Sequence, residues 1–570
     1  MLDKLKRDKY ISFHVGAFIS LAVIVVWSVA LVYFHLFEPI DFNQFEITAL
    51  CTLAIASGSL IPVIWLRKRW GYLLVIIVCA IVPAGGVYAV YEGSYFFSFS
   101  LYNLSVLLVI LVAIAGIILS YKAYRQVPVP VGRRPIIAVI GSLLLLILVA
   151  YAFQTNYSAI YQFSSTQIQN QISNKLNGLD NIEEKIEFLV DKGGIPSMVA
   201  GIVVDDQLVF SKAFGDANVH TAYSTGSVTK MFTATAVMQL YEEGLIDLDN
   251  DASLYLPFEI HHPEHSQPIT VRNLLSHQSG LAGLTILQES YYIDEKLIDW
   301  LSDKLGWPIQ EISPYPSLAE YLEGLITPGS QYYFDGVWLP VEPGAEHHYS
   351  NTNYYILATM IEHISGQSYS DYIRENVFDT LNMDSSGFDY TEIGDRYAAG
   401  YEREYSLLSK TNIEVPDYGK VPGAGGLIST VDDMSKFLIS QLNEGYLDNA
   451  HVLTSDSIAM MHDRIVDGGG HINKVGYGLG FTHLSYTPWQ FYGHLYGMKG
   501  AIGHEGGNIG YSATMYFIKE GSGGYGYVLL SNESTIEKGV NYSWYFPIYY
   551  KINVLLMEEA TNRYEMKHGQ

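Results

Sequence analysis

A sharp change in composition near residue 155 constrains the fold of this chain more than any other feature. Residues 1–155 contain long apolar runs, whereas the rest of the 570 residues mixes apolar and charged residues as soluble domains do. The chain holds 33 Lys/Arg and 58 Asp/Glu; the first 155 residues contain 11 and 6 of these, leaving 22 and 52. The first part is therefore +5 and the second −30, and two structural units are predicted.

Five apolar stretches in the first part are long enough to cross a bilayer, which takes about 20 helical residues. They lie near 11–36, 47–66, 71–91, 101–121 and 135–153. A backbone surrounded by lipid must satisfy its own hydrogen bonds, so each stretch is predicted to be a helix. We expect an all-α transmembrane region of five helices over 1–155 that stays embedded in the lipid bilayer.

The basic residues of this region predict its orientation. They precede the first span, follow the second and separate the fourth from the fifth: Lys4, Lys6, Arg7, Lys9, Arg67, Lys68, Arg69, Lys122, Arg125, Arg133 and Arg134. The other loops carry acidic residues and no Lys or Arg. Because positive charge favours the cytoplasmic side, we expect a multi-pass cell-membrane protein with a cytoplasmic N-terminus and an extracytoplasmic C-terminal part.

The C-terminal part is predicted to be one domain on a tether. Residues 156–175 are a polar linker, 176–560 the domain and 561–570 a C-terminal tail. A helix over 179–193 and strands over 197–204 and 207–214 open the domain, and strands over 511–520 and 526–532 with a helix over 534–556 close it. Strands at both ends of a largely helical middle predict an α/β fold, with one antiparallel sheet completed by the two chain ends and a helical subdomain.

Ser227 and Lys230 stand three residues apart at the start of an expected helix, in the segment YSTGSVTKMF. Three residues are about one turn, so both side chains share a face. A serine hydroxyl is a weak nucleophile until a base takes its proton, and a lysine amine can be that base. The helix N-terminus also supplies backbone donors for a developing oxyanion.

Five segments in order resemble the landmarks of the class C β-lactamase-like serine hydrolases. They are TGSVTK at 225–230, ITVRNLLSHQSGL at 269–281, EPGAEHHYSN at 342–351, PGAGGLIST at 422–430 and GHEGGNIGYSA at 503–513. That family includes penicillin-binding DD-peptidases, D-aminopeptidases and esterases. The resemblance covers about 190–555 and implies a β-lactamase/transpeptidase-like domain.

The resemblance also implies roles for individual residues. Ser227 would be the acylated nucleophile and Lys230 its base. Tyr349 would relay the proton to the leaving group, and Asn351 would hold the substrate's amide carbonyl or position Lys230. The backbone N–H groups of Ser227 and Gly507 would form the oxyanion hole.

The third landmark departs from the β-lactamase pattern. The chain has His504-Glu505-Gly506 where a Lys-Thr-Gly strand would be expected. His504, Gly506 and Gly507 are predicted to contact substrate. Histidine is mostly neutral near pH 7, so capture of a substrate carboxylate is weakened and efficient β-lactamase activity is not expected.

Other patterns are assigned no chemistry. The letters of His261-His262-Pro263-Glu264-His265 match an inverted zinc-protease motif, but Pro263 opposes the helix that such a site needs. We therefore expect no metal and no organic cofactor. A domain as acidic as this one would repel phosphate backbones, so nucleic acid is not an expected partner. His277 is interpreted as structural.

The sequence thus predicts a membrane-anchored, extracytoplasmic serine hydrolase. It would act through an acyl-enzyme on an ester or a peptide amide, including peptides with D-amino acids. The alternatives are a sensor or scaffold of penicillin-binding fold without turnover, and a weak β-lactamase. Residues 285–340 match no landmark and are expected to roof the cleft or to form an ordinary helical cap. No oligomeric state is indicated.

Overall fold

The computed structural model describes residues 172–283, 300, 317–330, 332–405, 410–416, 423–467, 476–484, 498, 500–534 and 545–569. The chain divides into two compact units, residues 1–171 and 172–570, and the described residues all belong to the second. The five expected membrane helices, and the linker up to residue 171, lie outside the described residues. Within the described ranges no helix combines the length and the apolar character that a membrane span requires.

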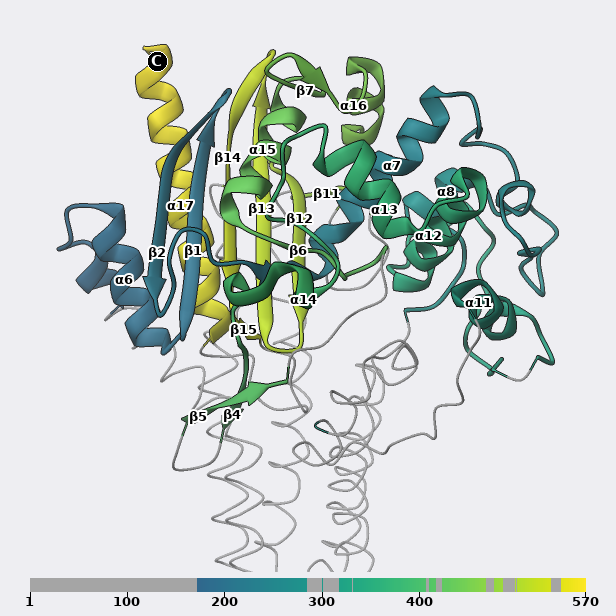
Figure 1. Ribbon diagram of the computed structural model, residues 1–570, viewed down its shortest axis with the longest axis horizontal. Coiled ribbons are helices and arrows are strands. Elements are labelled where there is room, and N and C mark those ends of the chain that lie inside the picture. Colours follow the sequence, from purple (N-terminus) through teal and green to yellow (C-terminus); the bar gives the residue numbers. More distant parts are fainter. Residues whose placement is uncertain are drawn as a thin grey trace, which may run out of the picture. The chain divides into compact units, whose positions relative to one another are not determined.

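An eight-stranded sheet in the order β2-β1-β14-β13-β12-β11-β10-β9 forms the centre of the second unit (Figure 1). All of its pairings are antiparallel. The N-terminal hairpin of β1 (Ser197–Val204) and β2 (Gln207–Gly215) pairs directly with β14 (Gly523–Ser531) from the other end of the chain. The prediction of one antiparallel sheet completed by both chain ends is confirmed.

The remaining strands have two residues each, except the β4–β5 and β12–β13 hairpins, whose strands have six to ten. They are β3 (Tyr223–Ser224), β4 (Gly400–Tyr405), β5 (Lys410–Val415), β6 (Ile428–Ser429), β7 (Tyr446–Leu447), β8 (Ala450–His451), β9 (Val466–Asp467), β10 (Gly476–Tyr477), β11 (Thr482–His483), β12 (Ile502–Asn508), β13 (Tyr511–Glu520) and β15 (Glu533–Ser534). Strands β3 and β6 pair with each other outside the large sheet.

Helices cover both faces of the sheet. Helices α6 (Ile182–Gly193) and α17 (Tyr545–His568) pack together on one face, and α15 (Val431–Leu442) packs on the other (Figure 1). Helix α6 is capped at its start by Asn181, whose side chain accepts a hydrogen bond from the Glu184 amide, and at its end by Gly194 in the left-handed conformation. This helix end agrees with the helix that the sequence predicts over 179–193.

Helix α17 continues further than the sequence predicts. Residues 561–568, which the sequence assigns to a tail, are its last turns. Their composition is polar, so apolar periodicity does not mark them as helical. Two ion pairs stabilise this end: Arg563 Nε lies 2.8 Å from the Glu559 carboxylate one turn earlier, and Lys567 Nζ lies 2.8 Å from the Asp205 carboxylate in the β1–β2 turn.

A helical subdomain occupies the middle of the chain. Its helices, and the short helices around it, are η2 (Gly226–Val228), α7 (Thr229–Glu242), η3 (Ala252–Tyr255), α8 (Val271–Leu275), α11 (Leu318–Ile326), α12 (Asn351–Ser365), α13 (Tyr369–Ile373), η5 (Arg374–Phe378), α14 (Tyr390–Ile393), η6 (Gly394–Arg396) and α16 (Ser455–His462). Helix α12 packs against α7, α8, α11 and α13. Helix α7 is buried along nearly its whole length, and the Phe232 and Phe437 rings stack 4.0 Å apart between α7 and α15. A helix buried on every side holds its side chains in fixed positions.

The backbones of the turn η2 and of strand β12 are in direct contact, with no side chain between them. A Cβ added to Gly506 would overlap the Thr225 carbonyl oxygen and lie 3.0 Å from the Ser227 nitrogen. A Cβ added to Gly226, which has φ of +53°, would lie 2.6 Å from the Gly507 nitrogen. Only glycine permits this contact, which brings the start of α7 against the edge of β12.

Gly506→Ala is expected to break this contact, because its methyl group would have to displace the Thr225 carbonyl. We expect a loss of about 2–4 kcal/mol in the free energy of unfolding, in the range of overpacked buried positions. Denaturant unfolding followed by tryptophan fluorescence measures it. Gly507→Ala is the matched control, because a Cβ there meets no atom within 4 Å. Equal stability of the two variants would contradict the tight packing.

Buried histidines make the stability of this unit pH-dependent. Burial, together with the nearby charge of Lys519, lowers the pKa of His462 to about 3. The imidazole lies between the Phe481 and Phe517 rings, at 4.9 and 5.2 Å. Between this value and the ordinary pKa of about 6.5, only the unfolded chain binds the proton. The stabilising contribution is therefore complete above pH 6.5 and is lost as the pH falls.

Lowering the pH from 7 to 5.5 should cost about 1 kcal/mol for this one imidazole. His462→Gln is expected to show that much less loss of unfolding free energy over the same interval. His220→Gln, at an exposed position, is the control and should retain the wild-type difference. The same pH dependence in all three proteins would contradict the assignment of a neutral, buried His462.

Candidate active site

Ser227 and Lys230 meet at the junction of η2 and α7. Lys230 Nζ lies 2.9 Å from the Ser227 hydroxyl oxygen and donates a hydrogen bond of 2.7 Å to the Ala424 carbonyl oxygen. Lys230 is fully buried. The hydroxyl and the amine that the sequence placed one helical turn apart are in direct contact, and the second hydrogen bond directs the amine.

Residues 423–430 of the fourth landmark lie alongside the nucleophile. The Thr225 amide donates to the Leu427 carbonyl at 2.8 Å, and the Leu427 amide donates to the Thr229 hydroxyl at 3.1 Å. Strand β6 continues the contact by pairing with β3, immediately before Ser227. Two segments separated by about 200 residues therefore hold the serine turn together.

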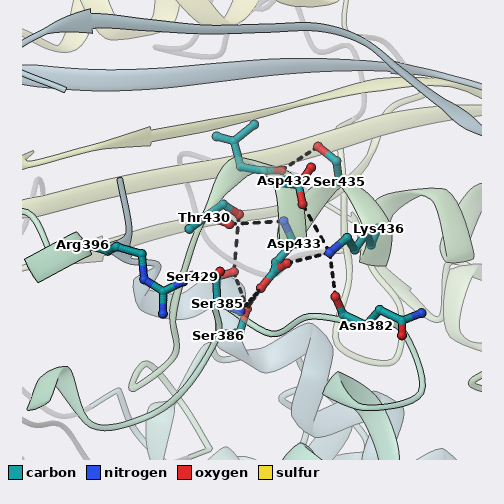
Figure 2. A network of polar contacts seen from close by, with 11 residues as sticks. Asn382, Ser385, Ser386, Arg396, Ser429, Thr430, Asp432, Asp433, Ser435 and Lys436 are labelled. Atoms are coloured by element: carbon teal, nitrogen blue, oxygen red, sulfur yellow. Dashed lines mark hydrogen bonds and ion pairs between the residues drawn. The ribbon is translucent and has the colours of Figure 1, made fainter. Parts of the chain in front are cut away.

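A polar network anchors β6 in turn (Figure 2). Asp433, almost completely buried in the first turn of α15, accepts hydrogen bonds from the Ser385 amide at 2.7 Å and the Ser386 hydroxyl at 2.9 Å. Its other oxygen lies 3.0 Å from Lys436 Nζ. The Ser386 hydroxyl also contacts the Ser429 hydroxyl at 2.8 Å, and Ser429 belongs to β6. The carboxylate thus ties three segments into the support of the serine turn.

Tyr349 lies beside this pair, in the segment that leads into α12. Its ring centroid is 5.0 Å from Lys230 Nζ, and the side chain is 39% exposed. Asn351 is the first residue of α12 and is partly buried. The structure therefore brings Tyr349 to Lys230, with one side of the phenol accessible from solvent.

Strand β12 brings Gly507 to the other side of the serine. Gly507 is exposed, and the position where its side chain would stand is open. The close approach of Gly226 to the Gly507 nitrogen puts that amide next to the serine turn. Backbone amides in such a pair form the donor set of an oxyanion hole.

His504, which the sequence predicts to contact substrate, is buried. Its Nδ1 contacts the Glu505 carbonyl oxygen and its Nε2 lies 3.1 Å from the Tyr477 hydroxyl. Burial first, and the charge of Lys230 second, lower the pKa of His504 to about 3. The imidazole is neutral at pH 7 and both of its nitrogens are engaged within the protein.

Two supporting residues are not among the site residues that the sequence predicts. Asn508 donates from its amide nitrogen to the Ser224 hydroxyl at 2.6 Å and to the Gly425 carbonyl at 2.9 Å. It therefore joins β12 to both segments of the serine turn. Asn353 is fully buried and donates to His277. Both lie in or next to the landmarks quoted above, which is the signal that could have found them.

In the histidine-rich loop 261–265, both ring nitrogens of His262 form hydrogen bonds within the protein. His262 contacts the Leu339 carbonyl oxygen through Nε2 at 2.8 Å and accepts the Glu264 amide at Nδ1, at 3.1 Å. Within the described ranges no three His, Cys, Asp or Glu side chains form a group suited to a metal ion. Of the insert 285–340, helix α11 is described and packs on α12, whereas residues 285–299 and 301–316 lie outside the described residues.

Comparison with known proteins agrees with this arrangement. PbpX of Bacillus subtilis (strain 168), named as a penicillin-binding protein, is 30% identical over 250 residues, which are 42% of this chain and 54% of PbpX. Protein flp of Staphylococcus aureus (strain N315) is 27% identical over 274 residues, 46% of this chain and 48% of flp. The chain thus spans about half the length of these relatives.

Among solved structures, the octameric penicillin-binding protein homologue from Pyrococcus abyssi is similar, with a TM-score of 0.52 and 25% identity. The match covers 66% of this chain and 76% of that one. The sequence model of the family described as Beta-lactamase matches residues 182–546, more than half of the chain. Together with the serine turn, the antiparallel sheet and the helical subdomain, this match shows that the protein belongs to the β-lactamase family, whose fold is that of serine hydrolases.

Proposed function

We propose that this protein is a serine hydrolase that cleaves a neutral amide or ester through an acyl-enzyme on Ser227. The observation that carries the proposal is the 2.9 Å hydrogen bond between Lys230 Nζ and Ser227 Oγ at the N-terminus of a buried helix. A hydroxyl held against an amine is prepared to lose its proton as it attacks a carbonyl carbon.

The steps follow from the neighbouring groups. Ser227 Oγ attacks the carbonyl, its proton passes to the Lys230 amine, and the oxyanion is held by the amides of Ser227 and Gly507. The tetrahedral intermediate expels the amine or alcohol, which receives through Tyr349 the proton that Lys230 took from Ser227. Water then attacks the Ser227 ester and gives a proton to the Lys230–Tyr349 pair, and the second tetrahedral intermediate expels Ser227 Oγ, which takes that proton back as the acid product leaves. Asn351, at the start of α12, is proposed to orient the substrate's amide carbonyl.

Ser227→Ala is expected to abolish both covalent labelling by a fluorophosphonate and turnover of a panel of esters and D-amino-acid peptide amides. Lys230→Met should lower the rate of labelling by at least about 10³-fold, because it removes the base. Gel fluorescence and steady-state kinetics on the full chain measure these effects. Labelling of Ser227 without turnover of any substrate would instead identify a sensor or scaffold.

The neutral imidazole of His504 supports a substrate without a carboxylate beside the scissile bond. A permanent cation in this strand would attract such a carboxylate, but His504 is buried and uncharged at pH 7. The same argument weighs against efficient β-lactam hydrolysis. Among amides, the resemblance to penicillin-binding proteins favours peptides with D-amino acids, and esters of similar size are equally compatible.

A matched pair of substrates tests this preference. N-acetyl-D-Ala-D-Ala carries a C-terminal carboxylate, and its C-terminal methylamide does not. We expect kcat/KM to be at least about tenfold higher for the methylamide, which corresponds to about 1.4 kcal/mol of lost charge stabilisation. A preference for the free acid would contradict the proposal and indicate a cation elsewhere in the cleft.

We further propose that residues 1–155 anchor the hydrolase to the cell membrane, with the catalytic unit outside. The five apolar stretches and their one-sided basic residues support this topology. A membrane-impermeant fluorophosphonate should then label Ser227 in intact cells. Labelling only after lysis would contradict the orientation.

A further inference from the structure

The loop after α8 wraps the segment that carries Tyr349. The His348 amide donates to the His277 carbonyl at 2.8 Å, and the Ser350 hydroxyl donates to the Ala282 carbonyl at 2.7 Å. A Cβ on Gly283 would lie 2.8 Å from the Tyr349 carbonyl oxygen. The residues before and after the tyrosine are therefore both fixed by this loop, and His277 lies near its start.

The hydrogen bonds of His277 determine its tautomer. Nδ1 lies 3.2 Å from the Ser350 amide nitrogen, and a backbone N–H can only donate. Nδ1 must therefore be an acceptor, which places the proton on Nε2. The Asn353 amide nitrogen lies 3.1 Å from the same Nδ1 and donates to it as well.

The orientation of the Asn353 amide is fixed independently. The Ser279 hydroxyl accepts from the Leu281 amide at 3.1 Å and donates to Asn353 Oδ1 at 2.6 Å. The Asn353 amide nitrogen is then the atom that faces His277. A chain of hydrogen bonds from Ser279 through Asn353 thus holds the imidazole in one tautomer and one orientation.

The His277 ring lies against the phenol of Tyr349. The two ring centroids are 4.4 Å apart with a tilt of 39°, and the rings of Tyr354 and Tyr477 lie 5.1 and 4.9 Å from the imidazole. His277 is completely buried and adopts φ of +58°, a conformation that a bulky residue rarely takes. This strained backbone is maintained where it supports the tyrosine segment.

The surroundings of His277 also keep it uncharged. Burial first, and then the nearby His347, Lys230 and His504, lower the pKa of His277 well below its ordinary value. A neutral ring is also what the Ser350 amide requires, because a protonated Nδ1 would face that donor with a second donor. The ring therefore packs on Tyr349 without adding a cation beside Lys230.

We propose that His277 is the positioning residue of Tyr349: its neutral imidazole, oriented by Ser279 and Asn353, holds the phenol at the distance from Lys230 at which it passes the proton to the leaving group. His277 itself touches no substrate in this role. The inference rests on the proposed function and adds to it a residue that the sequence alone marks as structural.

A double-mutant cycle on the full chain tests this role. His277→Asn retains an acceptor near the position of Nδ1 and a residue type that tolerates positive φ, but removes the ring that supports Tyr349. We expect kcat on an amide or ester substrate to fall by about 10–100-fold, with KM changed by less than about threefold, as for a displaced catalytic group. In a Tyr349→Phe background the same substitution should change the residual kcat by less than about threefold, because there is no phenol to misplace.

Two further variants keep the outcome decisive. His462→Asn, at a buried histidine away from the site, should leave kcat within about threefold of wild type. If His277→Asn does not fold, Ser279→Ala is tested instead. This variant removes the hydrogen bond that orients the Asn353 amide but leaves the imidazole in place. The loss of kcat should be smaller, and it should again disappear in the Tyr349→Phe background. Equal fold-losses in the wild-type and Tyr349→Phe backgrounds would overturn the inference. A wild-type enzyme without turnover would instead contradict the proposed function.

Discussion

The contact between η2 and β12 is the constraint on which the rest of the site depends. Gly226 and Gly506 let two backbones meet without side chains between them, so that the start of α7 abuts the edge of the sheet. Ser227 belongs to one backbone and Gly507 to the other. Any side chain at either glycine would separate the two amides that could share an oxyanion, and no change elsewhere in the cleft could restore their spacing.

Buried hydrogen bonds beneath the cleft hold the reactive groups in place. Lys230 is directed by the Ala424 carbonyl, and Asn508 joins β12 to Ser224 and Gly425. The Asp433 network secures β6, which pairs with the strand before the nucleophile (Figure 2). Satisfied buried networks of this kind are rigid, because each unmade hydrogen bond would leave a costly unpaired group. Such rigidity suits groups that must stay within hydrogen-bonding distance of each other.

Several features were predictable because they depend on near neighbours in the sequence. The Ser227–Lys230 pair follows from helical spacing, the end of α6 follows from Gly193 and Gly194, and the terminal hairpins follow from apolar runs with short turns. The end of α17 could not be predicted in this way. Its last turns are polar, and contacts with Asp205 in a distant turn support them.

The sequence by itself determined the chemistry available, with a serine and a lysine one turn apart, a tyrosine two residues before an asparagine and a glycine-rich segment near the C-terminus. Only the tertiary structure decided which groups serve that chemistry and in which state. His504 is neutral because folding buries it beside Lys230, and His277 has a defined tautomer because the Ser350 amide, 73 residues away, donates to it. Protonation and orientation depend on burial and on partners far along the chain, which local spacing does not record.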